Sequence, residues 1–179
     1  EERARAATFT HAGRRREFTL GRAAARLLLA EHLGVEPGRV PLFVADDGAP
    51  AIEGEDVGVS IAHTGDHAVA AVAARRVGVD LERIAPRHPG LPQFLLHPEE
   101  YEPFDALPLD GTRGLILYWT LKEATLKALR TGFRLSPKKL RLELDLAGQA
   151  ACVHIADGPT MQVRFEERAQ CYLAVAFSE

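Results

Sequence analysis

Two long helical patterns, each followed by short stretches of alternating apolar residues, limit the folds open to this 179-residue chain. The first pattern runs over residues 14–33 and ends at Gly34, a residue that commonly terminates helices. The second runs over residues 112–132. Each helical pattern is followed by segments in which apolar and polar residues alternate, which is typical of strands. The order helix, strands, helix, strands predicts an α+β fold with two similar halves packed together.

The expected strands cover residues 57–60, 67–74, 77–83, 140–146, 161–165 and 172–177. A Pro-rich connector over residues 86–92 separates the two groups of strands, so we expect an N-terminal half at residues 1–85 and a C-terminal half at residues 86–179. In the first helix, the wheel predicts that the core is contacted by Leu20, Ala24, Leu27 and Leu28.

Composition excludes several classes of protein. A net charge of −3 gives no reason to expect nucleic acid or an anionic membrane as a partner. The chain has no apolar run long enough to cross a bilayer and no signal-peptide pattern. Cys152 and Cys171 lack metal-ligand spacing and are expected to be reduced thiols of a cytoplasmic protein. The chain begins at Glu1 rather than Met, so further residues are expected before it.

Two carboxylates alternate with apolar residues in the third expected strand. Asp80 and Glu82 would point to one face, about 6.6 Å apart, while Val79 and Leu81 enter the core. Neighbouring carboxylates repel unless water screens them or a cation lies between them, and Mg²⁺ accepts such ligands together with phosphate oxygens. For this pair alone, an ordinary solvated strand face is the simpler explanation. Gly78 favours the site, because its missing side chain would let a ligand approach the backbone.

A third carboxylate lies on the second helix. Trp119, Glu123 and Lys127 fall on one helical stripe. Glu123 and Lys127 have the spacing of a common surface ion pair, which is the simplest explanation. The neighbouring Trp119 instead suggests that Glu123 enters a partly apolar site, where it would complete a magnesium set or act as a base.

Basic residues in the first half suit a ligand with several phosphates. Arg15, Arg22 and Arg26 lie within about 40° of one another on the helical wheel. Guanidinium groups bind phosphate bidentately, although a solvated basic face gives the same pattern. His63, expected in a tight turn just after a strand, is a further phosphate donor. Walker, GxGxxG, GxSxG and HExxH motifs are all missing, which removes several common enzyme classes.

Taken in order, these segments resemble the 4′-phosphopantetheinyl transferase family in its pseudo-dimeric, surfactin-synthetase-type form. The matching segments are Arg15-Arg-Glu-Phe-Thr-Leu-Gly-Arg22 with Arg26, Ser60-Ile-Ala-His63, Gly78-Val-Asp-Leu-Glu82 and Trp119-Thr-Leu-Lys-Glu-Ala-Thr-Leu-Lys127. The resemblance implies a fold in which the two halves form an intramolecular pseudo-dimer. No partner subunit is then needed, so a monomer is expected.

The resemblance also implies an activity. Enzymes of this family transfer the phosphopantetheine arm of coenzyme A to a serine of an acyl or peptidyl carrier protein and release 3′,5′-ADP. Asp80, Glu82 and Glu123 would hold Mg²⁺, and Glu123 would also act as the base. Lys127 and Lys122 would neutralise the phosphates, and the 3′-phosphate or pyrophosphate would be bound by His63, Arg16, Arg22 and Arg26.

Two residues depart from the family pattern. Ala49 stands where Gly-Lys-Pro usually has its lysine, and Ala62 replaces a serine that often precedes the histidine. Both put the affinity for coenzyme A in doubt. Two other functions therefore stay open: a non-catalytic protein that binds coenzyme A or a carrier, and a magnesium-dependent phosphohydrolase. The connector over residues 86–107, with Phe94, Leu95 and Leu96, either lines a carrier groove or belongs to the core.

Overall fold

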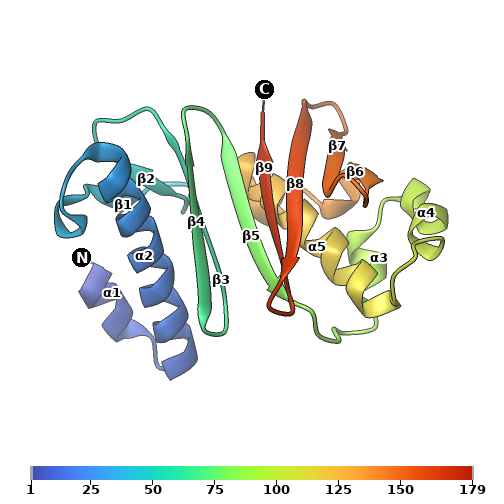
Figure 1. Ribbon diagram of the computed structural model, residues 1–179, viewed down its shortest axis with the longest axis horizontal. Helices are drawn as coiled ribbons and strands as arrows, with labels where there is room; N and C mark the ends of the chain where they lie inside the picture. The colour runs from blue at the N-terminus through green and yellow to red at the C-terminus, as the bar shows by residue number, and fades with distance from the viewer. Residues whose placement is uncertain (1, 179) are drawn as a thin grey trace.

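The computed structural model describes residues 2–178, which fold into two halves lying side by side (Figure 1). The N-terminal half begins with helices α1 (Glu2–Thr8) and α2 (Ala12–Leu33), followed by a 3₁₀ turn at Pro37–Arg39. Two antiparallel hairpins come next. Their strands are β1 (Leu42–Val44) with β2 (Pro50–Ile52), and β3 (Gly58–Thr64) with β4 (His67–Ala73).

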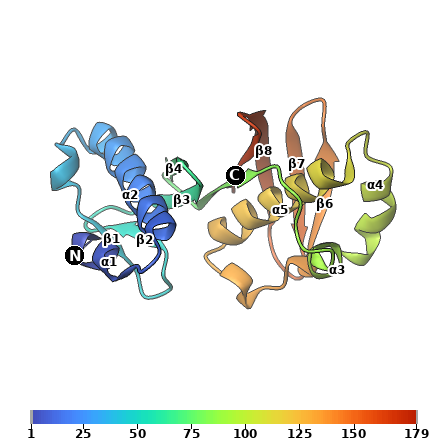
Figure 2. The same ribbon diagram turned by 90° about the horizontal axis from the view of Figure 1, so that it is seen from below.

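The C-terminal half is a five-stranded antiparallel sheet in the order β5-β9-β8-β7-β6. Its strands are β5 (Val77–Arg83), β6 (Leu140–Asp145), β7 (Ala150–Ile155), β8 (Thr160–Arg168) and β9 (Cys171–Phe177). Between β5 and β6 lie α3 (Leu91–Leu95), α4 (Tyr101–Asp105) and α5 (Gly111–Ala128), with 3₁₀ turns at Pro98–Glu100, Gly132–Arg134 and Pro137–Lys139. Helix α5 packs across one face of the sheet (Figure 2).

The predicted α+β class is confirmed, with one long helix packed on antiparallel strands in each half. Gly34 ends α2 in the left-handed conformation, with φ of 67°, as its sequence position suggested. Sequence patterns did not predict α1, β1, β2 or β7. The division at residues 85 and 86 stays a prediction. Strand β5 precedes this boundary, yet it pairs along its whole length with β9.

The predicted core face of α2 is displaced from the buried one. Leu20, Ala24 and Leu28 are half-buried and Leu27 is 63% exposed, whereas the buried residues of the helix are Gly21, Ala25, Leu29 and Ala30. A Cβ atom at Gly21 would lie 2.8 Å from the Ile61 side chain, so small residues let α2 lie directly on β3. Close approach of the helix to β3 thus buries the face that carries Gly21, and Leu27 is turned away from it.

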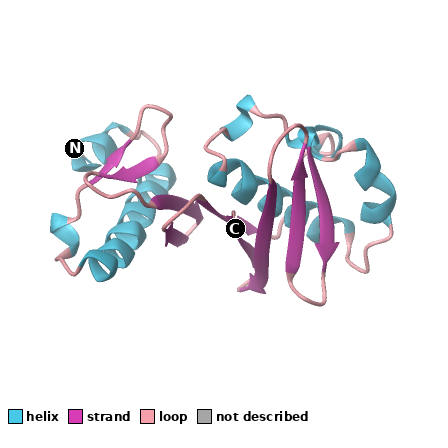
Figure 3. Cartoon of the chain, turned by 90° about the horizontal axis from the view of Figure 1, so that it is seen from above, coloured by secondary structure: helices cyan, strands magenta, loops and turns pink. Residues whose placement is uncertain are grey.

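The two halves meet through an apolar layer of their own. It consists of Ala62, Val79, Leu81 and Cys171, surrounded by partly buried residues of β4 and β9. The Val79 backbone N–H donates to Ser60 Oγ at 2.9 Å and ties β5 to β3. Figure 3 shows β3 and β4 between α2 and the larger sheet. Within residues 2–178, no helix is long and apolar enough to cross a membrane.

Candidate active site at the junction of β5 and α5

Gly78 sets the distance between β5 and α5. A Cβ atom at this position would lie 1.9 Å from Ala124 O and 2.4 Å from Ala128 N. The missing side chain therefore admits the helix rather than a ligand, which corrects our interpretation of this glycine. Asp80 and Glu82 share the face of Gly78 and point toward α5, while Val79 and Leu81 enter the apolar layer between the halves. The predicted division of this strand into two faces is confirmed.

Asp80 is almost completely buried beside α5, with 4% of its surface exposed. Lys127 Nζ donates to its Oδ1 at 2.6 Å, but Oδ2 has no partner among the described residues. Burial raises the pKa of Asp80, and the charge of Lys127 opposes this effect. The carboxyl group therefore has one oxygen that a further positive group could still satisfy.

Glu123 lies one turn before Lys127, and its Oε1 is also buried without a hydrogen-bond partner in the described chain. Loss of solvent raises the pKa of Glu123 to about 7, and the negative charges of Asp80 and Glu82 add to this shift. Glu123 is therefore poised to exchange a proton near neutral pH, which suits a general base.

Both oxygens of Glu82 have donors. Trp119 Nε1 donates to Oε1 at 3.1 Å, and Arg87 Nη2 donates to Oε2 at 2.5 Å. Burial, together with the charge of Asp80, raises the pKa of Glu82. The Trp119 contact explains why an indole shares the helical stripe of Glu123, because it fixes a carboxylate of the neighbouring strand.

Lys122 does not join this group. Its ammonium is fully buried and donates to Glu100 Oε2 at 2.5 Å and to the carbonyl oxygens of Leu95 and Pro137 at 2.8 and 3.2 Å. Three acceptors satisfy the three N–H groups of the ammonium. The predicted phosphate role of Lys122 is therefore wrong, and the residue holds α5 to the segments around it.

His63 lies within β3 rather than in a turn after it, which corrects the sequence-based expectation. Its side chain is 41% exposed, and its Nδ1 lies 3.8 Å from Glu17 Oε2. Glu17 Oε1 in turn accepts the Gly65 N–H at 3.1 Å. The imidazole lies beside Gly21 of α2, and a positive charge on it would be the weakest of the effects that lower the pKa of Asp80.

The three predicted arginines do not form one cluster. Arg26 is a structural residue, since it donates to Pro37 O and Val40 O at 2.9 Å each and to Glu2 at 2.7 Å. Arg16 is exposed and pairs with Asp66 on the surface. Arg22 alone has a buried nitrogen, Nη1, that no described residue accepts, and its guanidinium lies over the Phe18 ring.

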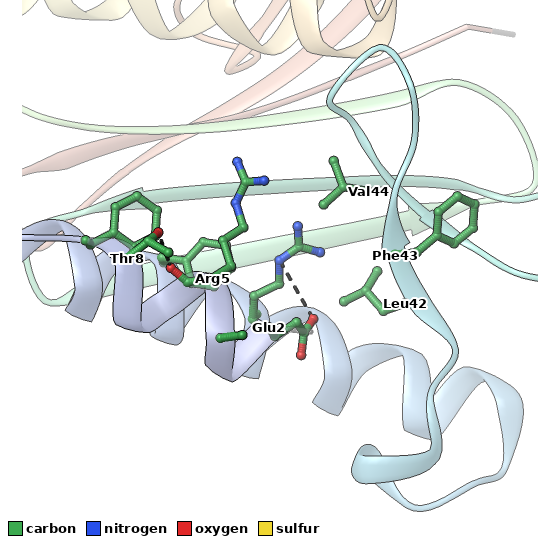
Figure 4. A pocket seen from close by; sticks show the side chains of 10 residues that line it. Glu2, Arg5, Thr8, Leu42, Phe43 and Val44 are labelled. Carbon is green, nitrogen blue, oxygen red and sulfur yellow. Dashed lines mark hydrogen bonds and ion pairs between the residues drawn. The ribbon is translucent and has the colours of Figure 1, made fainter.

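Arg22 lines a cavity of about 790 Å³ between α1, α2 and β1 (Figure 4). Arg5 and Glu2 line the same cavity from α1, together with Phe9 and Phe18, whereas the ring of Phe43 points away from it (Figure 4). Two guanidinium groups beside aromatic rings suit an anionic ligand with a planar group. Sequence reasoning missed Arg5, because no periodic or motif signal distinguishes it from the other arginines of this region.

The arrangement of the carboxylates fits a cation only in part. Among residues 2–178, no three His, Cys, Asp or Glu side chains lie close enough together to hold a metal ion as they stand. Asp80 Oδ2 and Glu123 Oε1 are nevertheless buried acceptors without donors, and such atoms are satisfied by a bound cation. The donor set fits Mg²⁺, provided that Glu82 is released from its present partners.

Comparison with known proteins identifies the family. Residues 76–176 match the 4′-phosphopantetheinyl transferase superfamily, and residues 1–73 match the N-terminal domain of 4′-phosphopantetheinyl transferases. The chain therefore belongs to the 4′-phosphopantetheinyl transferase superfamily, as its motifs predicted.

Two curated relatives are similar to the chain. It is 36% identical to the 4′-phosphopantetheinyl transferase HetI of Nostoc sp. over 141 residues, which cover 74% of this chain and 59% of the relative. The chain thus spans less than two thirds of that relative. A 4′-phosphopantetheinyl transferase of Bacillus subtilis is 24% identical over 88% of this chain and 71% of its own length. Among solved structures, a holo-[acyl-carrier-protein] synthase from Neisseria meningitidis aligns with a TM-score of 0.47 and 18% identity, covering 56% of this chain and 94% of its own.

Proposed function

We propose that this protein transfers the 4′-phosphopantetheine group of coenzyme A to a serine of an acyl or peptidyl carrier protein. The observation that carries the proposal is the junction of β5 and α5. There, Asp80 and Glu123 present unpartnered buried oxygens beside Lys127, in a chain that belongs to the transferase superfamily.

In the proposed reaction, the serine hydroxyl of the carrier attacks the phosphorus that bears the pantetheine arm. A new P–O bond forms to serine, the P–O bond to the nucleotide breaks, and 3′,5′-ADP leaves. Glu123 takes the serine proton, directly or through a water, because it is the carboxylate of the junction whose Oε1 has no donor among the described residues. Lys127 neutralises charge on the phosphates, which is the main requirement of phosphoryl transfer.

We further propose that Asp80, Glu82 and Glu123 hold Mg²⁺. When bound, this ion would neutralise the pyrophosphate and fix its orientation. The unpartnered Asp80 Oδ2 and Glu123 Oε1 support this assignment. His63 stays a candidate for a phosphate contact, and the cavity with Arg5 and Arg22 is the candidate site for the nucleotide end of coenzyme A.

The carrier protein is proposed to bind beside Trp119. Phe94 and Phe133 are 47% and 56% exposed, and their rings lie 5.9 Å apart. Phe133 also lies 5.9 Å from Trp119, which bonds Glu82. These exposed aromatic rings suit an apolar helix face next to the modified serine. Leu95 and Leu96 are buried and belong to the core.

A monomeric state and a cytoplasmic location remain parts of this proposal.

The test is the intact mass of purified apo carrier protein after incubation with this protein, coenzyme A and Mg²⁺. We expect a gain of one phosphopantetheine, which Glu123→Ala and a chelator both abolish. A matched control is Glu143→Ala, which removes a surface carboxylate of β6. No gain with carriers from several pathways would favour the non-catalytic binding protein. Breakdown of coenzyme A without a carrier would favour the phosphohydrolase.

A further inference from the structure

Arg87 holds one of the three candidate metal ligands. It lies in the connector that follows β5, and its Nη2 donates to Glu82 Oε2 at 2.5 Å. Within residues 2–178, no other side chain forms an ion pair with Arg87. The indole of Trp119 occupies the other oxygen of Glu82. A cation that bridges the three carboxylates therefore competes directly with Arg87.

The charges of the site also point to this competition. When all three carboxylates are ionised, they exceed their two basic neighbours, Lys127 and Arg87, by one negative charge. A bound divalent cation turns this excess into one positive charge. The net positive charge then attracts the phosphates of a ligand. The basic side chains are no longer needed to neutralise the carboxylates, because the cation does so.

We propose that Arg87 is an exchangeable counter-ion: it holds Glu82 in the metal-free protein, leaves when a divalent cation binds, and then binds a phosphate of coenzyme A. The exchange rests on the proposed function of the site. Arg87 then binds the substrate, although it lies outside the active-site motifs.

The surroundings of Arg87 favour such an exchange. Its side chain is 36% exposed, and the chain on either side forms no helix or strand. Partly exposed ion pairs contribute little to stability, so the guanidinium can leave at small cost. Guanidinium groups bind phosphate bidentately, and Arg87 already contacts one of the candidate ligands of the proposed cation. Lys122 is the opposite case, because it is fully enclosed and cannot move to a ligand.

The single tryptophan of the chain provides a readout that is independent of activity. The Trp119 indole N–H donates a hydrogen bond to Glu82, so its fluorescence reports changes in the partners of that carboxylate. We would titrate Mg²⁺ alone into the wild-type protein, Arg87→Gln and Arg113→Gln, and then titrate coenzyme A at saturating Mg²⁺. Arg113 is the matched control, because it forms a comparable ion pair with Glu167, which is not one of the candidate metal ligands.

Arg87→Gln is expected to bind Mg²⁺ about 2–5-fold more tightly, because the competing pair is gone. The same variant should bind coenzyme A roughly tenfold or more weakly, since a charged hydrogen bond to phosphate is lost. Arg113→Gln should match the wild-type protein in both titrations. These opposite effects separate exchange from a structural role, in which both affinities would fall together.

Equal or weaker Mg²⁺ binding by Arg87→Gln would overturn the proposal, and so would unchanged binding of coenzyme A. If the wild-type protein shows no response to Mg²⁺, the proposed metal site fails and the exchange fails with it. A normal wild-type response with an unaltered variant overturns the exchange alone.

Discussion

Helix α5 carries two lysine–carboxylate pairs that differ in one essential respect. Lys122 and Glu100 are each 1% exposed, and Glu100 also accepts the N–H groups of His97 and Leu142 at 2.6 and 2.7 Å. In the second pair, Lys127 is 31% exposed and Asp80 keeps an oxygen without a donor. The two pairs use similar chemical groups five residues apart, yet only the second has bonding capacity left for a ligand.

This difference separates a structural pair from a functional one. A buried charge that is fully hydrogen-bonded fixes the elements around it, and removing one partner leaves an uncompensated charge. A buried carboxylate with a free oxygen raises the free energy of the empty protein and lowers it again when a cation binds. We therefore predict that substitutions at Lys122–Glu100 mainly lower stability, whereas substitutions at Lys127–Asp80 mainly lower activity.

The largest expected effect is on catalysis. Glu123→Gln should lower the rate of carrier modification by about 10²–10⁴-fold, because the proposed base can no longer accept a proton. The melting temperature should stay the same or rise, since a buried charge with an unpartnered oxygen disappears. Rates and melting curves for Glu143→Gln, a surface change, should match the wild-type protein. An active Glu123→Gln would show that another group is the base.

The next largest effect is on stability. Lys122→Met should lower the free energy of unfolding by about 3–5 kcal/mol, because Glu100 then stays buried without its counter-ion. Lys127→Met should cost only about 1–2 kcal/mol, since Asp80 can take up a proton, but this variant should lose most of its activity. Urea unfolding measures both, with the exposed Lys138→Met as control. Equal losses of stability at Lys122 and Lys127 would contradict the distinction between the pairs.

The pH dependence of stability should report on Glu123, which lies beside the Lys127–Asp80 pair. The folded protein raises the pKa of Glu123 from 4.5 to about 7, chiefly through burial, so it holds this proton more tightly than the unfolded chain does. The contribution of Glu123 to stability is therefore full below pH 4.5 and is lost as the pH rises to about 7. The loss amounts to roughly 3 kcal/mol without metal.

Comparison of the metal-free wild-type protein with Glu123→Gln at pH 5 and pH 8 measures this term. The wild-type protein should lose more stability between these values than the variant does. Asp80 and Glu82, whose pKa values are also raised, should leave a loss of the same sign in the variant. Identical losses in both proteins would mean that Glu123 titrates like an exposed glutamate.

Local periodicity was enough to predict the two long helices, the common face of Asp80 and Glu82, and the segment that carries Glu123. It could not distinguish Lys122 from Lys127, because the partner of Lys122 comes from a 3₁₀ turn 22 residues earlier in the chain. The role of Arg26 was hidden for the same reason, since its acceptors are backbone carbonyls of a loop. Side-chain roles that depend on distant backbone acceptors leave no periodic signal in the sequence.

Gly78 allows a test of the Lys127–Asp80 pair alone. It lies where β5 contacts α5, and this contact brings Lys127 and Asp80 together, whereas Lys122 and Glu100 do not depend on it. A side chain here would meet Ala124 O at 1.9 Å and push α5 away from β5 at the turn that carries Lys127. Gly78→Ala should destabilise the protein by about 1–3 kcal/mol, as overpacking usually does. It should also lower the affinity for Mg²⁺, measured by Trp119 fluorescence, because Asp80 and Glu123 lie on the two separated elements. Gly13→Ala, where a Cβ meets no atom within 4 Å, is the matched control. If Gly78→Ala lost stability but bound Mg²⁺ normally, the carboxylates would not need the close packing of α5 on β5.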